Sequence, residues 1–188
     1  VLIGEDQRVL AEATAPLSVS RPAEGWSEQA PSDWISAAEV VFDRLAAQGL
    51  GGVKGIGLSG HMHGATLLDA RDEVLRPCIL WNDTRAHVEA GELDANPIFR
   101  RLTGNIVFPG FTAPKLLWVA RHEPGLRNRV AKVLLPKDYL RLWLTGEHVA
   151  EMSDAAGTSW LDTGRRDWSD DLLQATGLTR GQMPRLVE

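Results

Sequence analysis

Extended and helical patterns alternate along this chain, and their order limits the fold more than any other feature. Apolar residues flank a Gly-Glu-Asp-Gln turn within residues 1–19, which predicts a hairpin. An apolar strand is expected at 53–59, a second hairpin turning at 70–73, and another extended pair at 147–163. Helical spacing occurs at about 33–48, 85–94, 112–122 and 136–144, and Ser169 is expected to cap a last short helix. This order predicts an α/β fold in which helices cover both faces of a mixed sheet.

Composition and charge argue against several classes of function. The 188 residues are 44% apolar and 24% charged, as in an ordinary globular domain. The net charge is −5 and no basic cluster stands out, so we expect no nucleic-acid partner. The apolar runs are too short to span a bilayer, and we expect no membrane association. The single cysteine, Cys78, excludes an intrachain disulfide, which favours the cytoplasm.

Both ends of the chain look internal to a longer protein. It begins on Val1-Leu2-Ile3, with no initiator methionine and no signal-peptide pattern, and its last residues carry no stop signal. We therefore expect residues 1–188 to be one domain that is incomplete at both ends.

Residues 55–67, GIGLSGHMHGATL, pose the main question about function. Gly55, Gly57 and Gly60 match the spacing of a dinucleotide-binding loop, but they lie within the predicted strand and no helix follows them. His61 and His63 would lie on one side of an extended chain and could chelate zinc, yet no second pair of ligands is spaced to complete a site. The remaining readings are a hydrogen-bonded core histidine, or a histidine that faces a small ligand between close-approaching glycines.

Other polar residues stand where a binding crevice could form. Asp83 and Arg85 follow the predicted strand that ends in LWND, and residues just past strand ends commonly line a crevice. The alternative for Asp83 is that it caps the next helix. Asp154 lies in a turn of small residues, where it could bind hydroxyl groups or simply form the turn. Trp26, in a loop, is the tryptophan most open to a surface or cleft role.

Several segments resemble the FGGY carbohydrate kinases in order and spacing. GFTAPKLLW matches the first signature of that family, with Gly110, Thr112, Lys115, Leu116 and Trp118 at its defining places. The segments GHMHGATLLD, LRPCILWND, LTGN, LLPKDYLR, SDAAGT and RDWS look like the xylulokinase branch of the family. The resemblance covers essentially all of the chain.

The resemblance implies a fold, a reaction and a set of site residues. The fold is ribonuclease-H-like, as in the actin-like ATPases, here without its first strands, and the reaction is ATP-dependent phosphorylation of D-xylulose to D-xylulose 5-phosphate. The sugar-contacting Met-His pair of the family falls on Met62 and His63. Asp83, Arg85 and Asp154 are weaker candidates for the sugar pocket or its surroundings. The resemblance is also compatible with a homodimer.

The same resemblance implies that this chain holds no catalytic, cofactor-binding or metal-binding residue. The phosphate hairpin would precede Val1, and the catalytic aspartate and ATP-binding domain, with the sites for ATP and Mg²⁺, would follow Glu188. The chain alone should therefore be inactive. Two alternatives remain open: a non-catalytic sugar-binding module, or a kinase of the family that acts on another sugar. The family usually has glutamine where this chain has His61, and the role of His61 is unassigned.

Overall fold

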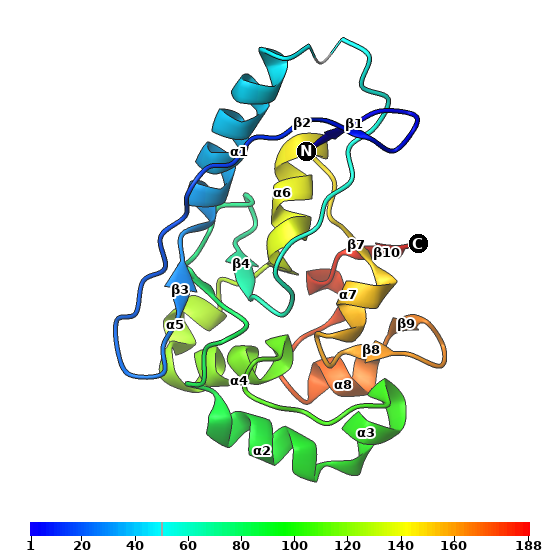
Figure 1. The fold of residues 1–188 in the computed structure, drawn as a ribbon. Helices are drawn as coiled ribbons and strands as arrows, with labels where there is room; N and C mark the ends of the chain where they lie inside the picture. Colours follow the sequence, from blue (N-terminus) through cyan, green and yellow to red (C-terminus); the bar gives the residue numbers. More distant parts are fainter. Residues whose placement is uncertain (50) are drawn as a thin grey trace.

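The computed structural model describes residues 1–49 and 51–188. Helices and short strands alternate along the described chain (Figure 1). The strands are β1 Leu2–Ile3, β2 Val9–Ala11, β3 Glu28–Gln29, β4 Thr66–Leu68, β5 Cys78–Ile79, β6 Lys132–Leu134, β7 Val149–Glu151, β8 Leu161–Asp162, β9 Asp167–Trp168 and β10 Arg185–Val187. The helices are α1 Pro31–Ala46, α2 His87–Ala95, α3 Pro97–Thr103, α4 Thr112–His122, α5 Pro124–Arg127, α6 Pro136–Thr145, α7 Met152–Ala156, α8 Asp170–Gln174 and the 3₁₀ turn η1 Arg180–Gln182.

The strands pair as short ladders rather than as one long sheet. β3 pairs with β5 and β4 pairs with β6, both antiparallel, and a bridge between Ala65 and Ile79 joins these two pairs side by side. β1 and β2 form the predicted first hairpin. β7 and β10 are parallel, which makes the strand pairing mixed, as expected from the sequence.

Two groups of helices surround these strands. α1 and α6 lie side by side in the upper part of the molecule, next to the β1–β2 hairpin, and α2 to α5 lie below them (Figure 1). The main core joins the lower helices to the strands, and its fully buried members include Phe99, Leu116, Trp160 and Leu172. Burying a leucine or phenylalanine side chain contributes roughly 1.5–3 kcal/mol, so this core holds α3, α4 and α8 together.

The predicted strand at 53–59 is not observed. Residues 53–60 are irregular, and their backbone has no hydrogen-bond partner among the described residues. Ile56 is 59% exposed, so the apolar pattern of this segment is not buried against a neighbour. A strand exists only where a second strand pairs with it, and the sequence pattern of one segment does not supply that partner.

Other predicted elements need smaller corrections. The first helix begins at Pro31, because proline fits the first helical turn, where its missing N–H is not needed. The second hairpin turns as expected through a bridge from Leu68 to Val74, but its strands pair mainly with β6 and β3. The extended pair at 147–163 is interrupted by α7. The predicted cap is confirmed, since the Ser169 side chain accepts a hydrogen bond from the Leu172 N–H.

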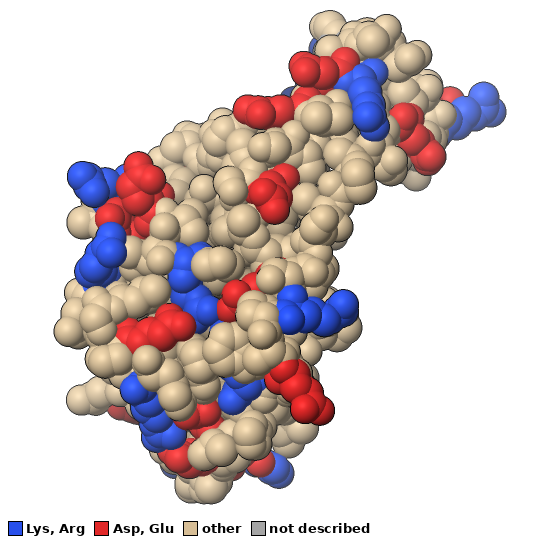
Figure 2. All heavy atoms as spheres, turned by 90° about the vertical axis from the view of Figure 1, so that its left-hand side faces the viewer, with Lys and Arg blue, Asp and Glu red and all other residues tan. Residues whose placement is uncertain are grey.

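Charge is dispersed over the surface. On the face drawn in Figure 2, lysine and arginine side chains lie among aspartates and glutamates and form no large patch of one sign. Among the described residues, no helix combines the length and the apolar character needed to cross a membrane.

Candidate functional site

His63 lies at the centre of the candidate site, in a backbone conformation that is unusual for a residue with a side chain. Its φ angle is 65°, in the left-handed region. The ring lies against Gly157, just after α7, and Nδ1 is 2.8 Å from the Gly157 carbonyl oxygen. A Cβ on Gly157 would be 2.5 Å from Cε1 of His63, so only glycine leaves room for the ring there.

The contact with Gly157 determines which ring nitrogen of His63 carries the proton. A carbonyl oxygen only accepts hydrogen bonds, so Nδ1 of His63 must carry a proton and donate it. Burial lowers the pKa of His63, and this outweighs the Gly157 bond, which raises the pKa. The ring is therefore neutral at pH 7, and Nε2 is left as a hydrogen-bond acceptor.

The main chain of His63 is held by two side chains of α4. The Lys115 ammonium donates to the His63 carbonyl at 2.8 Å and to the Gly110 carbonyl at 2.6 Å. The Thr112 hydroxyl donates to the same His63 carbonyl at 3.2 Å. Lys115 is fully buried, and this burial lowers its pKa to about 7. Sequence reasoning had identified Thr112 and Lys115 only as signature positions, with no role at the site.

Aromatic side chains form the apolar wall beside His63. The ring centroids of His63 and Phe111 are 4.6 Å apart, and those of Phe108 and Phe111 are 4.1 Å apart. Gly110 packs against the Trp81 carbonyl, where a Cβ would be 2.5 Å from the oxygen. Met62, next to His63, is 44% exposed. Phe108 and Phe111 were not singled out from the sequence, because aromatic residues before a helix most often belong to the core.

Asp154 lies in α7, three residues before Gly157, in a charged cluster. Its carboxylate is 3.0 Å from the Lys137 ammonium at the start of α6. Lys137 is also 2.7 Å from Asp138. Burial raises the pKa of Asp138 to about 6, against the opposing effect of Lys137. The structure thus brings Asp154 near His63 through α7, in a cluster where one lysine is shared by Asp138, Glu151 and Asp154.

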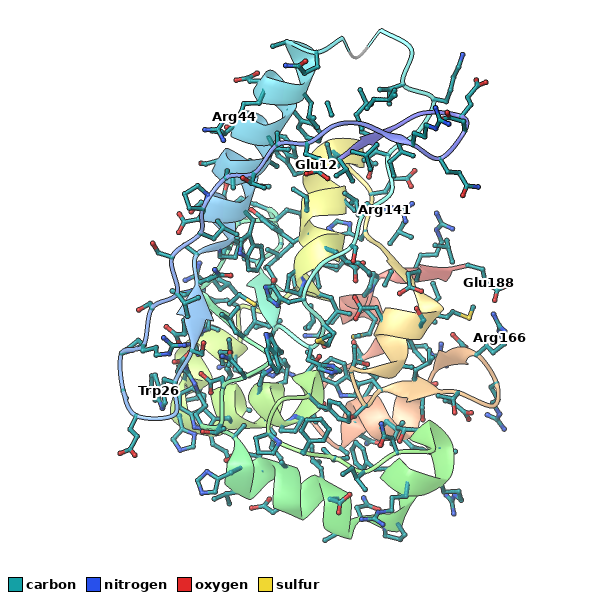
Figure 3. All side chains as sticks on the ribbon, in the orientation of Figure 1. Glu12, Trp26, Arg44, Arg141, Arg166 and Glu188 are labelled. Carbon is teal, nitrogen blue, oxygen red and sulfur yellow. The ribbon has the colours of Figure 1, made fainter. Side chains whose placement is uncertain are left out.

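Asp83 and Arg85 form a separate buried network with each other. The two side chains make a bidentate pair, with Nε–Oδ1 and Nη2–Oδ2 distances of 2.9 and 2.7 Å. Asp83 also accepts from the Ser27 N–H at 2.6 Å, and Arg85 pairs with Glu28 at 2.7 Å. The Arg85 guanidinium lies 3.7 Å above the Trp26 ring (Trp26 is labelled in Figure 3). These contacts occupy both side chains, and they give Trp26 a partner within the protein.

His61 does not share a site with His63. Its ring packs edge-on against Trp34 of α1, with a centroid distance of 5.5 Å, and burial lowers its pKa. The left-handed residue His63 breaks the extended conformation that would have put both rings on one side. Within residues 1–49 and 51–188, no group of three or more His, Cys, Asp or Glu side chains is placed to hold a metal ion.

The chain belongs to the FGGY family of carbohydrate kinases. The model of the N-terminal domain of that family matches residues 1–188. The xylulose kinase of Escherichia coli K12 is 55% identical over 190 residues, which cover all of this chain and 39% of that protein. The chain thus spans well under half the length of this curated relative.

Solved structures agree with this assignment. The crystal structure of a xyloylose kinase from Brucella ovis superposes with a TM-score of 0.97 at 63% identity, over 99% of this chain and 40% of that one. A gluconate kinase from Lactobacillus acidophilus gives a TM-score of 0.95 at 24% identity, over 100% of this chain and 39% of that one, which shows the shared fold alone. The expected ribonuclease-H-like, actin-like ATPase fold is confirmed.

Proposed function

We propose that the complete protein transfers the γ-phosphoryl group of ATP to D-xylulose, and that residues 1–188 form its N-terminal, sugar-binding domain. The observation that supports D-xylulose as the substrate is the 55% identity to the Escherichia coli xylulose kinase across the whole of this chain. In this proposal the catalytic base, the ATP site and Mg²⁺ belong to other parts of the complete protein. We also infer a cytoplasmic protein, and a homodimer as one state that light scattering can test.

His63 supplies the chemistry of sugar binding in this proposal. Its Nδ1 is fixed by Gly157, so neutral Nε2 can accept a hydrogen bond from a sugar hydroxyl and orient that hydroxyl. Met62 and the wall made by Phe108 and Phe111 would contact the apolar C–H groups of the sugar. Asp154 would accept a hydrogen bond from a second hydroxyl, and its contact with Lys137 would hold the carboxylate in place. Asp83 and Arg85 would act from outside the pocket, by supporting the loop that carries Trp81.

Positioning is the contribution that such a domain makes to phosphoryl transfer. The reaction requires an attacking hydroxyl held in line with the phosphorus, and fixed hydrogen-bond partners reduce the entropy cost of reaching that geometry. A half-buried, neutral imidazole with one nitrogen already bonded is a fixed partner of this kind.

The test is an assay of the complete protein with ATP and D-xylulose, in which ADP release is coupled to NADH oxidation and the product mass is measured. We expect xylulose phosphate, and a higher sugar KM or lower kcat for His63→Ala. Activity with gluconate or glycerol but not D-xylulose would support a kinase of different specificity. Sugar binding by calorimetry without any ADP release would instead support the non-catalytic module.

A further inference from the structure

Burying the Lys115 side chain costs folding free energy, and packing of the apolar core does not account for a lysine at this position. Its side chain is fully buried at the first turns of α4, and its ammonium meets two main-chain carbonyls rather than a carboxylate. Removing an ammonium from water without a counter-ion is strongly unfavourable. A leucine or methionine of similar volume would pack in this place without that penalty, so the lysine must serve something other than packing.

The two carbonyl groups that accept hydrogen bonds from Lys115 indicate its role. One is the carbonyl of His63, and the other is the carbonyl of Gly110, which packs under the Trp81 main chain. Lys115 thus joins the histidine to the loop that carries the aromatic wall. Thr112, also fully buried, bonds the same His63 carbonyl from one turn earlier in the helix.

The backbone of His63 needs such support. At φ 65° a residue with a Cβ is in a sparsely populated conformation, which persists only when its surroundings impose it. The peptide after His63 is fixed through its carbonyl by α4, and the ring is fixed through Nδ1 by Gly157. The imidazole is therefore held from both its main-chain and its side-chain end.

We propose that Lys115 and Thr112 are positioning residues for His63: by clamping its carbonyl they impose the left-handed backbone that directs the imidazole into the sugar site. This inference rests on the proposed sugar kinase function, because the consequence appears in sugar binding. Neither residue touches the substrate. The alternative is that the two bonds only stabilise the start of α4.

Thr112→Val is the sharpest test, because it removes one hydroxyl with almost no change in volume. In the complete protein we expect the KM for D-xylulose to rise about fivefold, the loss of one hydrogen bond, while the KM for ATP stays unchanged. Lys115→Met should raise the sugar KM by at least about tenfold, since it removes two bonds. Lys132→Met is the matched control: its ammonium also donates to a carbonyl, that of Gly181 at 2.7 Å, and sugar kinetics should not change.

A double-mutant cycle separates positioning from stabilisation. If Thr112 acts through the imidazole, Thr112→Val should have no further effect on sugar KM in a His63→Ala background. A purely stabilising role predicts the same lowering of Tm in both backgrounds and no change in sugar KM. An unchanged sugar KM in Thr112→Val, or full additivity in the cycle, would overturn the inference. Absence of activity in the unmodified protein would instead refute the proposed function itself.

Discussion

Gly157→Ala should disable the site without unfolding the protein. The new Cβ would be 2.5 Å from Cε1 and 2.7 Å from Nδ1 of His63. Non-bonded carbon atoms settle at about 3.5–4.0 Å, so the ring must move by about 1 Å. The backbone itself tolerates alanine, because Gly157 has φ −72° and ψ −3°. The cost therefore arises from the displaced imidazole and its strained bond to the Gly157 carbonyl.

The size of the effect follows from that displacement. A misplacement of about 1 Å can reduce a rate by about 100-fold. We expect a loss of this order in kcat/KM for D-xylulose, equivalent to about 2.7 kcal/mol of transition-state stabilisation. Stability should change little, because alanine restricts the unfolded chain by about 0.4–1 kcal/mol, which offsets part of the strain.

The assay is steady-state ADP release by the complete protein, with Tm measured on the same samples. Gly91→Ala in α2 is the matched control, because a Cβ there has no neighbour within 4 Å. It should raise stability by about 1 kcal/mol and leave the kinetics unchanged. If Gly157→Ala keeps kcat/KM within about threefold of the unmodified value, with a normal Tm, the His63 ring does not take part in sugar binding.

Three further predictions concern stability. Because burial lowers the pKa of Lys115 to about 7, below its ordinary value near 10.4, the unfolded state binds more protons above pH 7, and the free energy of unfolding should rise with pH. Urea titrations between about pH 7 and 8, below the ordinary pKa of about 8.5 at which the Cys78 thiol of the unfolded chain ionises, should show a shallower rise for Lys115→Met than for the unmodified protein. Parallel curves would contradict the lowered pKa of Lys115. Asp83→Asn should lower the free energy of unfolding by about 1–3 kcal/mol in urea denaturation, since the asparagine amide cannot accept both bonds from the buried Arg85, which keeps Glu28 as a counter-ion. Glu147→Gln, which breaks an exposed pair with Arg185, should cost under about 1 kcal/mol in the same titration. Ser169→Ala should cost about 1 kcal/mol in urea denaturation through loss of the α8 cap, and an unchanged midpoint would show that the cap contributes nothing.

Local signals in the sequence predicted the parts of the fold that depend on local chemistry. The helical spacing at 112–122 and 136–144 corresponds to α4 and α6, and the Ser169 cap was found because one side chain satisfies one helix end. The strand at 53–59 was wrong because strand formation depends on a partner, which periodicity within one segment cannot reveal.

In the candidate site, too, local sequence predicted some features, while others depend on contacts between distant parts of the chain. His63 was identified from its segment and from the family resemblance, but Gly157 and Lys115 lie 94 and 52 residues further along the chain, and only folding brings them to it. The left-handed backbone of His63 was also not predicted: histidine is enriched at positive φ relative to most residues, but that conformation is still uncommon for it. Whether Asp83, Arg85 and Asp154 affect sugar binding stays a prediction for mutagenesis.

The left-handed backbone at position 63 also bears on evolution and engineering. Glycine would adopt φ 65° without steric cost, so selection for stability alone would favour it there. If His63 binds sugar as proposed, the histidine at this position retains a functional side chain at a cost in folding free energy. Stabilising substitutions proposed from backbone geometry alone would include this residue, and would remove the group on which sugar binding is proposed to depend.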